Sequence, residues 1–307
     1  IDDIFFFFFI YAHESVVAHL LNLFNMMLIH CAVPNNFGIC IIVPIIKDRY
    51  GDSSTIENYR GITLSTMFSK VFEICLNDKL CQFFWTNDLQ CGFKKMHGCH
   101  HAIYVVQHVI DYFRKRGSQV YVATLDASKA FDRVDHCRLF DKLRDRGVPA
   151  CFIDVLVEWY SKLSAIVRWH NCFSSSFDIK AGVRQGGVLS PIFFNVYMDD
   201  LISQLSVCGY GCHINRRFLG CIMYADDILL ISASVNGLQK LLDTCFLYCV
   251  DVGLSLNAKK SNCVSIGGCG KMKISNMTIG MQEIEWSSSL KYLGVLFDVG
   301  KHLKVNC

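Results

Sequence analysis

The stretch CIMYADDILLIS, residues 221–232, places two adjacent carboxylates inside an apolar run with the composition of a buried β-strand. Asp226 and Asp227 have CIMYA before them and ILLIS after them, a pattern typical of a tight hairpin with both side chains at its tip. A buried carboxylate without a partner is costly or takes up a proton. The pair therefore needs a compensating partner, for which a bound cation is the obvious candidate. Without a second carboxylate site, a solvated turn is the alternative.

The stretch VYVATLDASKAFDRVDH, residues 120–136, supplies that second site. Asp126 ends an apolar strand, and the residues after it indicate a turn into a short helix. A carboxylate at such a position projects from a sheet edge toward a neighbouring strand. Asp132 and Asp135 lie in the more polar part and are interpreted as helix-surface or capping groups. Two carboxylate sites of this kind suit hard divalent cations, and two such ions support nucleotidyl transfer.

Composition excludes a disordered chain. Of the 307 residues, 52% are hydrophobic and 19% are charged, enough for one large or two smaller domains. The net charge of +3 permits a nucleic-acid partner without requiring one. The 17 cysteines are scattered and form no C-x-x-C pair, which favours free thiols in an intracellular protein. CGYGCH, residues 208–213, lacks a second ligand pair at zinc spacing and is interpreted as a loop.

The apolar run at residues 4–12 is too short to span a bilayer and follows two acidic residues, so stable membrane association is not expected. SIGGCGKMK, residues 265–273, lacks the first Gly and the final Ser or Thr of a phosphate-binding Walker A loop. The chain starts without Met and stops just after a strand-like run, as expected for a piece of a longer protein.

The chain mixes helical and strand-like segments. Apolar spacing predicts helices at residues 16–30 and on both sides of Gly147 and Pro149, and strands at residues 38–47 and 119–125. Ser190 is predicted to cap a further helix, with Pro191 at its first helical position. Short strands and turns alternate over residues 253–298. Because the order has no regular βαβ rhythm, the predicted class is α+β.

Taken together, these segments resemble the reverse transcriptase domain of non-LTR retrotransposons, the long interspersed or jockey-like elements. The resemblance runs in the family's order from about Leu20 to Asp298. The matching stretches are the fingers segment at 41–73, the LQCGFKKMHGCHHAI element at 89–103, motif A at 125–136 (LDASKAFDRVDH), motif B at 182–201 (GVRQGGVLSPIFFNVYMDDL), motif C at 224–227 (YADD), motif D at 253–261 (GLSLNAKKS) and motif E at 290–295 (LKYLGV).

The resemblance implies an α+β right-hand polymerase fold, with fingers, a palm of antiparallel sheet packed on helices, and a thumb that is largely missing. Its subdomains would be an N-terminal segment with fingers at 1–118, a palm at 119–298 and the start of a thumb at 299–307. Within the palm, residues 137–180 would form a helical insertion assigned either to the palm or to the fingers.

The resemblance also implies roles for residues. Asp126 and Asp226 match the metal-binding aspartates, and Asp227 is the third carboxylate of the set. Lys260 matches the motif D lysine that protonates the leaving pyrophosphate, with neighbouring Lys259 as the alternative.

Substrate contacts are implied for five further positions and for the alanine after the first aspartate. Phe131 matches the steric gate that favours dNTPs over rNTPs, with an ordinary core phenylalanine as the alternative. Gln185 and Gly186 match the motif B turn that approaches nucleotide and template, and Ala127 follows Asp126 at the same site. Lys47 and Arg60 match fingers residues that hold the triphosphate, although either can be merely solvated.

The leading hypothesis is therefore an RNA-directed DNA polymerase that extends a DNA primer 3′-hydroxyl with dNTPs on an RNA template. The implied cofactor is a pair of Mg²⁺ ions, with Mn²⁺ as a possible substitute, and the implied setting is a ribonucleoprotein in cytoplasm and nucleus. Protein partners stay unknown at this point. The alternative from another class is a non-catalytic retrotransposon-derived fragment that folds and binds RNA. An RNA-dependent RNA polymerase and a membrane-associated protein are the weaker alternatives.

Overall fold

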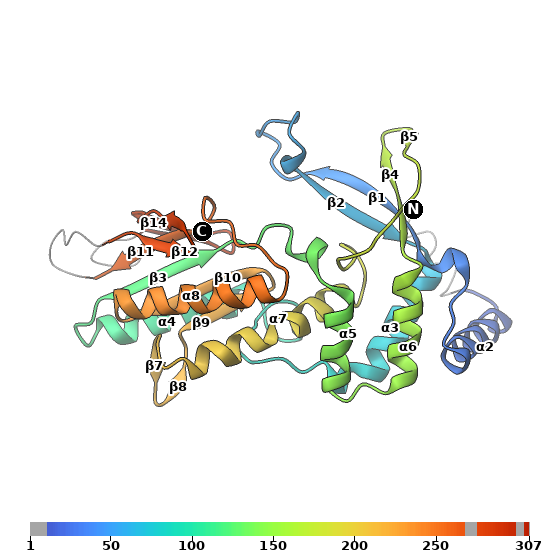
Figure 1. Cartoon of the computed structure of the whole chain (residues 1–307), viewed down its shortest axis with the longest axis horizontal. Helices are drawn as coiled ribbons and strands as arrows, with labels where there is room; N and C mark the ends of the chain where they lie inside the picture. The colour runs from blue at the N-terminus through green and yellow to red at the C-terminus, as the bar shows by residue number, and fades with distance from the viewer. Residues whose placement is uncertain (1–10, 268–274, 299–303, 307) are drawn as a thin grey trace. The chain divides into compact units, whose positions relative to one another are not determined.

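A computed structural model describes residues 11–267, 275–298 and 304–306, and the chain divides into two units (Figure 1). The first unit joins the residues up to Trp85 with Val134–Val196, and the second joins Thr86–Arg133 with the residues from Tyr197 onward. Helix α7 (Ser190–Val207) begins in the first unit and ends in the second. The sequence suggested bounds for fingers, palm and thumb, which are functional subdomains and divide the chain differently from these two units. Those bounds stay a prediction.

The first unit pairs a sheet with helices. Its strand order is β2-β1-β4-β5, β6 also pairs with β4, and all of these pairings are antiparallel except the parallel pair β1–β4. The described elements are α2 (Glu14–His30), η1 (Asn35–Gly38), β1 (Ile39–Ile46), η2 (Ile56–Asn58), β2 (Tyr59–Ser65), α3 (Met67–Leu80), η3 (Cys81–Phe83), α5 (His136–Asp145), α6 (Ala150–Ser161), β4 (Ser164–Trp169), β5 (Cys172–Phe173) and β6 (Phe177–Asp178).

An aromatic cluster forms the centre of the first unit. The ring of Phe72 on α3 lies 5.0 Å from Phe24 on α2, 5.8 Å from Phe37 in η1 and 5.7 Å from Trp159 on α6. Phe72 and Trp159 are fully buried. Tilted and edge-to-face pairs at these separations add to the stabilisation from apolar burial. The cluster therefore joins three helices that are distant in the sequence.

The second unit is built on an antiparallel sheet of strand order β11-β3-β10-β9, accompanied by a three-stranded sheet β14-β15-β16. The described elements are α4 (Cys99–Arg114), β3 (Val120–Leu125), η4 (Ala130–Arg133), β7 (His213–Ile214), β8 (Arg217–Phe218), β9 (Cys221–Tyr224), β10 (Asp227–Ser232), α8 (Val235–Asp251), β11 (Asn262–Ile266), β12 (Met277–Ile279), β13 (Gln282–Ile284), β14 (Ser289–Tyr292), β15 (Val295–Asp298) and β16 (Lys304–Asn306).

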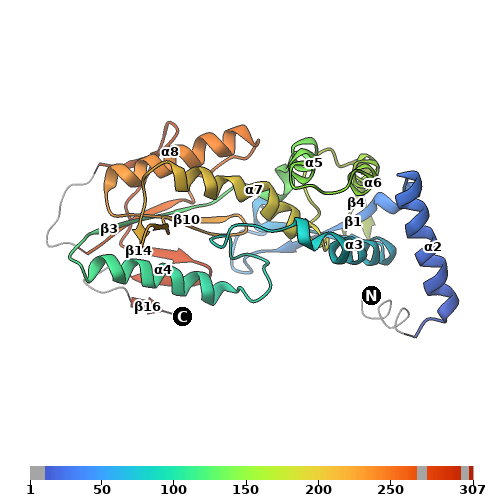
Figure 2. The same ribbon diagram turned by 90° about the horizontal axis from the view of Figure 1, so that it is seen from below.

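Helices cover both faces of the four-stranded sheet. In Figure 2, α4 lies on one side of β3 and β10, and α8 lies on the other. Leu229 and Ile231 of β10 share a core with Val106 and Ile110 of α4. Because side chains alternate along a strand, Ile228 and Leu230 face the α8 side. Each of these four β10 side chains is fully buried.

The predicted α+β class is confirmed, as are the helices and strands predicted within the described residues. The predicted cap at Ser190 is wrong. Helix α7 begins at Ser190 itself, whose hydroxyl is buried and has no hydrogen-bond partner among the described residues. The hydroxyl packs instead against the preceding loop, since a Cβ atom placed on Gly187 would lie 2.6 Å from it. Most of the apolar start at residues 4–12, and most of residues 299–307, lie outside the described residues.

Every cysteine in the described ranges is a free thiol. The CGYGCH stretch is a loop entering the hairpin β7–β8, in which the Cys208 thiol donates to the Leu205 carbonyl at 3.0 Å. Burial raises the pKa of the Cys212 thiol to about 12. Over the described part of the chain, no helix has both the length and the apolar character needed to cross a membrane.

The aromatic cluster predicts a large asymmetry between two phenylalanines of α3. Phe72→Ala would leave a cavity among three rings and lower the free energy of unfolding by about 3–5 kcal/mol, as measured by urea denaturation. Phe68→Ala on the same helix, where the side chain is 50% exposed, is the control and should cost about 0.5 kcal/mol. Equal losses would show that the cluster is not the centre of this unit.

Candidate functional site

Strand register brings the predicted carboxylates to one end of the second unit's sheet. Leu125 of β3 pairs with Ile228 of β10, so the next positions along the ladder are Asp126 and Asp227. Asp227 also pairs with Tyr224 of β9, which leaves Ala225 and Asp226 as a two-residue turn. Asp126 and Asp226 are half-buried and Asp227 is exposed. The hairpin tip predicted from the sequence is therefore present, with Asp126 beside it.

The turn contains one backbone conformation that is unfavourable for its residue type. Ala225 has φ of 55°, in the left-handed region. For a residue with a Cβ atom this conformation costs about 1–2 kcal/mol, so surrounding contacts must hold it. The conformation decides in which direction the next residue, Asp226, leaves the turn.

The loop that follows α8 contacts the Asp126 segment through the backbone. The Asn257 amide donates to the Asp126 carbonyl at 2.9 Å, and the Ser128 amide donates to the Ser255 carbonyl at 2.9 Å. Between these two bonds, Ala127 bridges to Leu256 in antiparallel fashion. Motifs A and D of the sequence are thus joined side by side.

Two lysines lie just after that junction. Lys259 and Lys260 are both exposed, and the Lys260 amide donates to the Asn257 carbonyl at 3.2 Å. Their exposure gives no preference for one over the other as the proton donor. Ala127, by contrast, is buried, with 5% of its surface exposed.

Phe131 is not a fully buried core phenylalanine. It lies in η4 and is half-buried. Its ring centroid is 6.5 Å from that of Phe93, which in turn is 6.3 Å from that of Tyr224 on β9. These three rings connect η4 with the strand β9 that leads into the acidic hairpin.

The four remaining predicted residues lie in the first unit. Lys47 directly follows β1, and Arg60 on β2 pairs with Ile45 of β1. Both basic side chains are exposed, and the Lys47 ammonium donates to the Glu57 carbonyl at 2.8 Å. The structure thus places Lys47 at the end of β1 and Arg60 on β2, and these two strands form one antiparallel ribbon.

The loop of Gln185 and Gly186 lies against the same ribbon. The Thr63 amide on β2 donates to the Gln185 carbonyl at 2.7 Å. Gly186 has φ of 125°, and a Cβ atom there would lie 2.7 Å from the Thr63 carbonyl oxygen. Only glycine satisfies both the backbone angle and this close approach.

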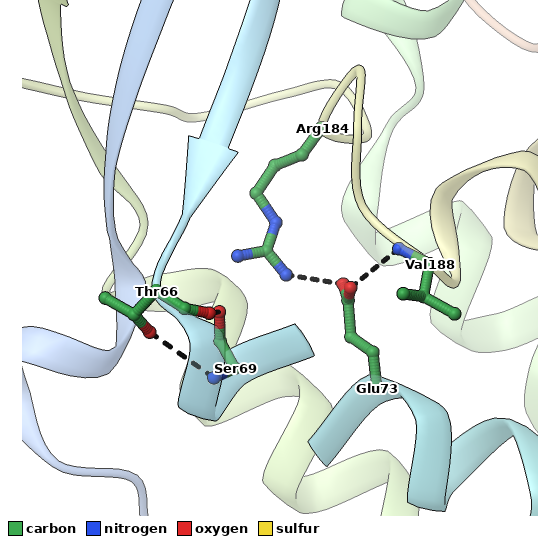
Figure 3. Close-up of polar contacts among 5 residues, drawn as sticks. All are labelled: Thr66, Ser69, Glu73, Arg184 and Val188. Atoms are coloured by element: carbon green, nitrogen blue, oxygen red, sulfur yellow. Dashed lines mark hydrogen bonds and ion pairs between the residues drawn. The ribbon is translucent and has the colours of Figure 1, made fainter. Parts of the chain in front are cut away.

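A buried glutamate ties the two ends of this loop together (Figure 3). Glu73 on α3 accepts a hydrogen bond from Arg184 Nη2 at 2.6 Å and another from the Val188 amide at 2.7 Å. Glu73 is 1% exposed and Arg184 is 4% exposed. One carboxylate therefore compensates a buried guanidinium before the loop and a backbone amide after it.

Two further contacts complete this arrangement. The Arg184 guanidinium lies over the Trp159 ring at 4.6 Å, a cation–π contact, while its Nε and Nη1 have no hydrogen-bond partner within the described residues. Thr66 caps α3 by accepting from the Ser69 amide at 3.3 Å, one turn before Glu73 (Figure 3). The cap fixes the start of the helix that carries the glutamate.

The sequence reasoning missed Glu73 and Arg184, although a signal for Glu73 is present. Helix α3 buries Ser69, Phe72, Glu73, Leu76 and Leu80. An acidic residue on the buried stripe of an amphipathic helix requires a positive or hydrogen-bonding partner. The signal predicts that a partner exists and does not name it.

The chemistry of the hairpin fits a hard divalent cation. Its side chains are carboxylates, and they are accessible at one end of the sheet. Among the described residues, no three His, Cys, Asp or Glu side chains are grouped closely enough to form a ready-made metal site. Mg²⁺ needs no such cage, because it keeps several waters and is held by one or two carboxylates together with substrate phosphates.

The predicted site residues therefore form two groups, one in each unit. The second unit brings together Asp126, Ala127, Phe131, Asp226, Asp227 and Lys260, and the first unit brings together Lys47, Arg60, Gln185 and Gly186. Their individual roles in binding and catalysis stay predictions.

Comparison with known proteins gives consistent matches. The family model described as "Reverse transcriptase (RNA-dependent DNA polymerase)" matches residues 47–297. The retrovirus-related Pol polyprotein of the type-2 retrotransposable element R2DM of Drosophila melanogaster is 29% identical over 307 residues, covering 96% of this chain and 28% of the relative. The RNA-directed DNA polymerase of the mobile element jockey of Drosophila funebris is 26% identical, with 93% and 31% covered.

Among solved structures, apo telomerase from Candida tropicalis, truncated from its C-terminal domain, has a TM-score of 0.61 at 13% identity. The match covers 90% of this chain and 56% of the telomerase chain, and it shows a shared polymerase fold. The chain spans less than a third of the length of the two curated relatives above, 28% and 31%.

The buried ion pair yields a stability prediction. Glu73→Gln leaves the Arg184 charge uncompensated in the interior and should lower the free energy of unfolding by about 3–5 kcal/mol in urea denaturation. Hydrogen exchange of the Val188 amide should also accelerate.

Glu158→Gln is the matched control. Glu158 pairs with Lys162 at 2.7 Å, but the side chains of the lysine and the glutamate are 30% and 35% exposed. Loss of such a surface pair should cost about 0–1 kcal/mol. An unchanged exchange rate at Val188 in the Glu73 variant would contradict the assignment of Glu73 as the residue that ties the loop.

Proposed function

The chain belongs to the reverse transcriptase (RNA-dependent DNA polymerase) family, and we propose that it extends a DNA primer with dNTPs on an RNA template. The resemblance to non-LTR retrotransposon polymerases seen in the sequence is confirmed by the family match and by the relatives. The observation that carries the proposal is the strand register that sets Asp126 beside the Asp226–Asp227 hairpin.

In this proposal, Asp126, Asp226 and Asp227 hold two divalent cations, Mg²⁺ or alternatively Mn²⁺. When bound, such ions supply positive charge that activates the primer 3′-hydroxyl and stabilises the leaving pyrophosphate. The protein's part is to bring carboxylates from β3 and from the β9–β10 hairpin to one place before substrate arrives. The ladder does this through backbone pairing, so little reorganisation is needed.

Other residues act on the nucleotide. Lys47 and Arg60 bind the triphosphate, for which an ammonium and a planar guanidinium are suited. Gln185 and Gly186 bring the backbone close to the incoming nucleotide and template. Lys260, or Lys259 beside it, donates a proton to pyrophosphate as it leaves.

The proposed partners are an RNA template, a DNA primer or nicked target, and dNTPs. The proposed setting is a ribonucleoprotein in the cytoplasm and nucleus. Free thiols in the described ranges support a reducing compartment, because disulfides form and persist in oxidising ones. The relatives' names support the retrotransposon context.

Primer extension on an RNA template with dNTPs and Mg²⁺ tests the activity. Asp226→Asn should lower the rate by about 100-fold or more, which is about 2.7 kcal/mol of barrier, because a charged ligand is lost from the reacting centre. Asp243→Asn, at an acidic side chain 44% exposed on α8, should leave the rate unchanged. Equal incorporation by wild type and Asp226→Asn would refute the site, and binding of RNA without incorporation would favour a non-catalytic fragment.

Sugar selectivity tests Phe131. Phe131→Val removes the ring that would crowd a 2′-hydroxyl, so the preference for dNTPs over rNTPs in kcat/KM should fall by about 10-fold or more. Phe152→Val on α6, another half-buried phenylalanine, is the control and should keep the wild-type ratio. An unchanged ratio in the Phe131 variant would mean that another group excludes rNTPs.

A further inference from the structure

We propose that Gln90 is a positioning residue that holds the Ala225–Asp226 turn in the conformation needed for cation binding; this inference rests on the proposed function. Gln90 is 1% exposed. Its side-chain oxygen accepts a hydrogen bond from the Ala225 amide at 2.9 Å, and its side-chain nitrogen donates to the Ala225 carbonyl at 3.4 Å. One amide side chain therefore satisfies both backbone groups of the residue with positive φ.

The Gln90 side chain is itself fixed. The same oxygen accepts a hydrogen bond from the Gly92 amide at 3.0 Å. On either side of Gln90, the Met223 amide donates to the Leu89 carbonyl and the Cys91 amide donates to the Met223 carbonyl, each at 2.8 Å. The segment thus lies beside β9 and makes a single parallel bridge to it, between Gln90 and Met223.

Close approach of this segment to the turn depends on Gly92. A Cβ atom placed there would lie 2.4 Å from the Ala225 amide nitrogen and 3.1 Å from the Tyr224 carbonyl carbon. A side chain at position 92 would push the segment away from the turn. Gln90 therefore supplies the hydrogen bonds to the turn, and Gly92 leaves the space for the segment to approach it.

The consequence for chemistry follows from the position of Asp226 directly after Ala225. Without Gln90, the buried backbone groups of Ala225 would need other hydrogen-bond partners, and Ala225 would favour a backbone conformation of lower energy at negative φ. A change of partner or of φ would rotate the Asp226 carboxylate relative to Asp126. Misplacement of a reacting group by about 1 Å costs about 100-fold in rate.

Gln239 offers a matched control in the same unit. Its side chain makes the same pair of bonds to another residue, accepting from the Thr278 amide at 3.0 Å and donating to the Thr278 carbonyl at 2.9 Å. These bonds join α8 to β12, and neither partner belongs to the acidic hairpin. Gln239→Met therefore removes an equivalent clamp without touching the proposed site.

The experiment compares Gln90→Met, Gln239→Met and Asp226→Asn with wild type. Terbium(III) binding by luminescence reports on the carboxylates without any need for turnover, and primer extension gives kcat and the KM for dNTP. Gln90→Met should weaken terbium binding by about 10-fold, as loss of a group that orients a ligand does, and lower kcat with little change in KM. Gln239→Met should retain both properties, whatever stability it loses.

Gln90→Glu keeps the inference testable even when the Met variant fails to fold. A protonated glutamate carries a carbonyl oxygen and an O–H group, so it can replace both bonds of the amide, whereas its anion cannot donate to the Ala225 carbonyl. The ratio of the variant's kcat to that of wild type should therefore rise as the pH is lowered from 8 to 6, because burial favours the neutral acid. A ratio that stays at one across this pH range would contradict the positioning role.

The outcomes separate this inference from the proposed function. Wild-type terbium affinity in Gln90→Met, alongside weakened binding in Asp226→Asn, overturns the role of Gln90 and leaves the proposed function standing. Equal losses of kcat in Gln90→Met and Gln239→Met also overturn it, since they would reflect general destabilisation. Terbium binding that does not depend on Asp226, together with no primer extension by wild type, overturns the proposed function itself.

Discussion

The antiparallel ladder between β3 and β10 decides where the acidic side chains lie. Both faces of β10 are buried, with Leu229 and Ile231 on one side and Ile228 and Leu230 on the other. A slip by one residue would exchange these two faces under helices shaped for the present order. Packing therefore enforces the register, and the register in turn sets Asp126 beside Asp227.

The two loops on which the proposed chemistry depends are stabilised in the same way. In each unit, a buried polar side chain from a remote segment supplies the hydrogen bonds that the loop cannot supply itself. Glu73 does so for the Gln185 loop, and Gln90 does so for the Ala225 turn. An unpaired buried group is expensive, so such a clamp gives a loop one strongly preferred conformation.

The helices, the strands and the hairpin tip could be predicted from the sequence alone, because alternation, apolar runs and turn residues are local signals. Phe131 and Lys260 could be proposed only through resemblance, since neither stands out chemically among many similar residues. The hydrogen bonds of Gln90 and Glu73 could not be predicted from the sequence, because Gln90 and Ala225 are separated by 135 positions and Glu73 and Val188 by 115. At Ser190, the local capping signal was misleading, because the helix begins at Ser190 itself and the hydroxyl is buried beside Gly187 without a hydrogen bond among the described residues.

The two units differ in the exposure of their cysteine thiols, and therefore in the reactivity of those thiols. The exposed cysteines of the described ranges, Cys75, Cys81, Cys137, Cys151 and Cys172, all belong to the first unit. In the second unit, burial raises the pKa of Cys249 and Cys263 to about 12, which keeps these thiols protonated and slow to react. Oxidants and alkylating reagents would therefore modify the exposed cysteines of the first unit before the buried cysteines of the second.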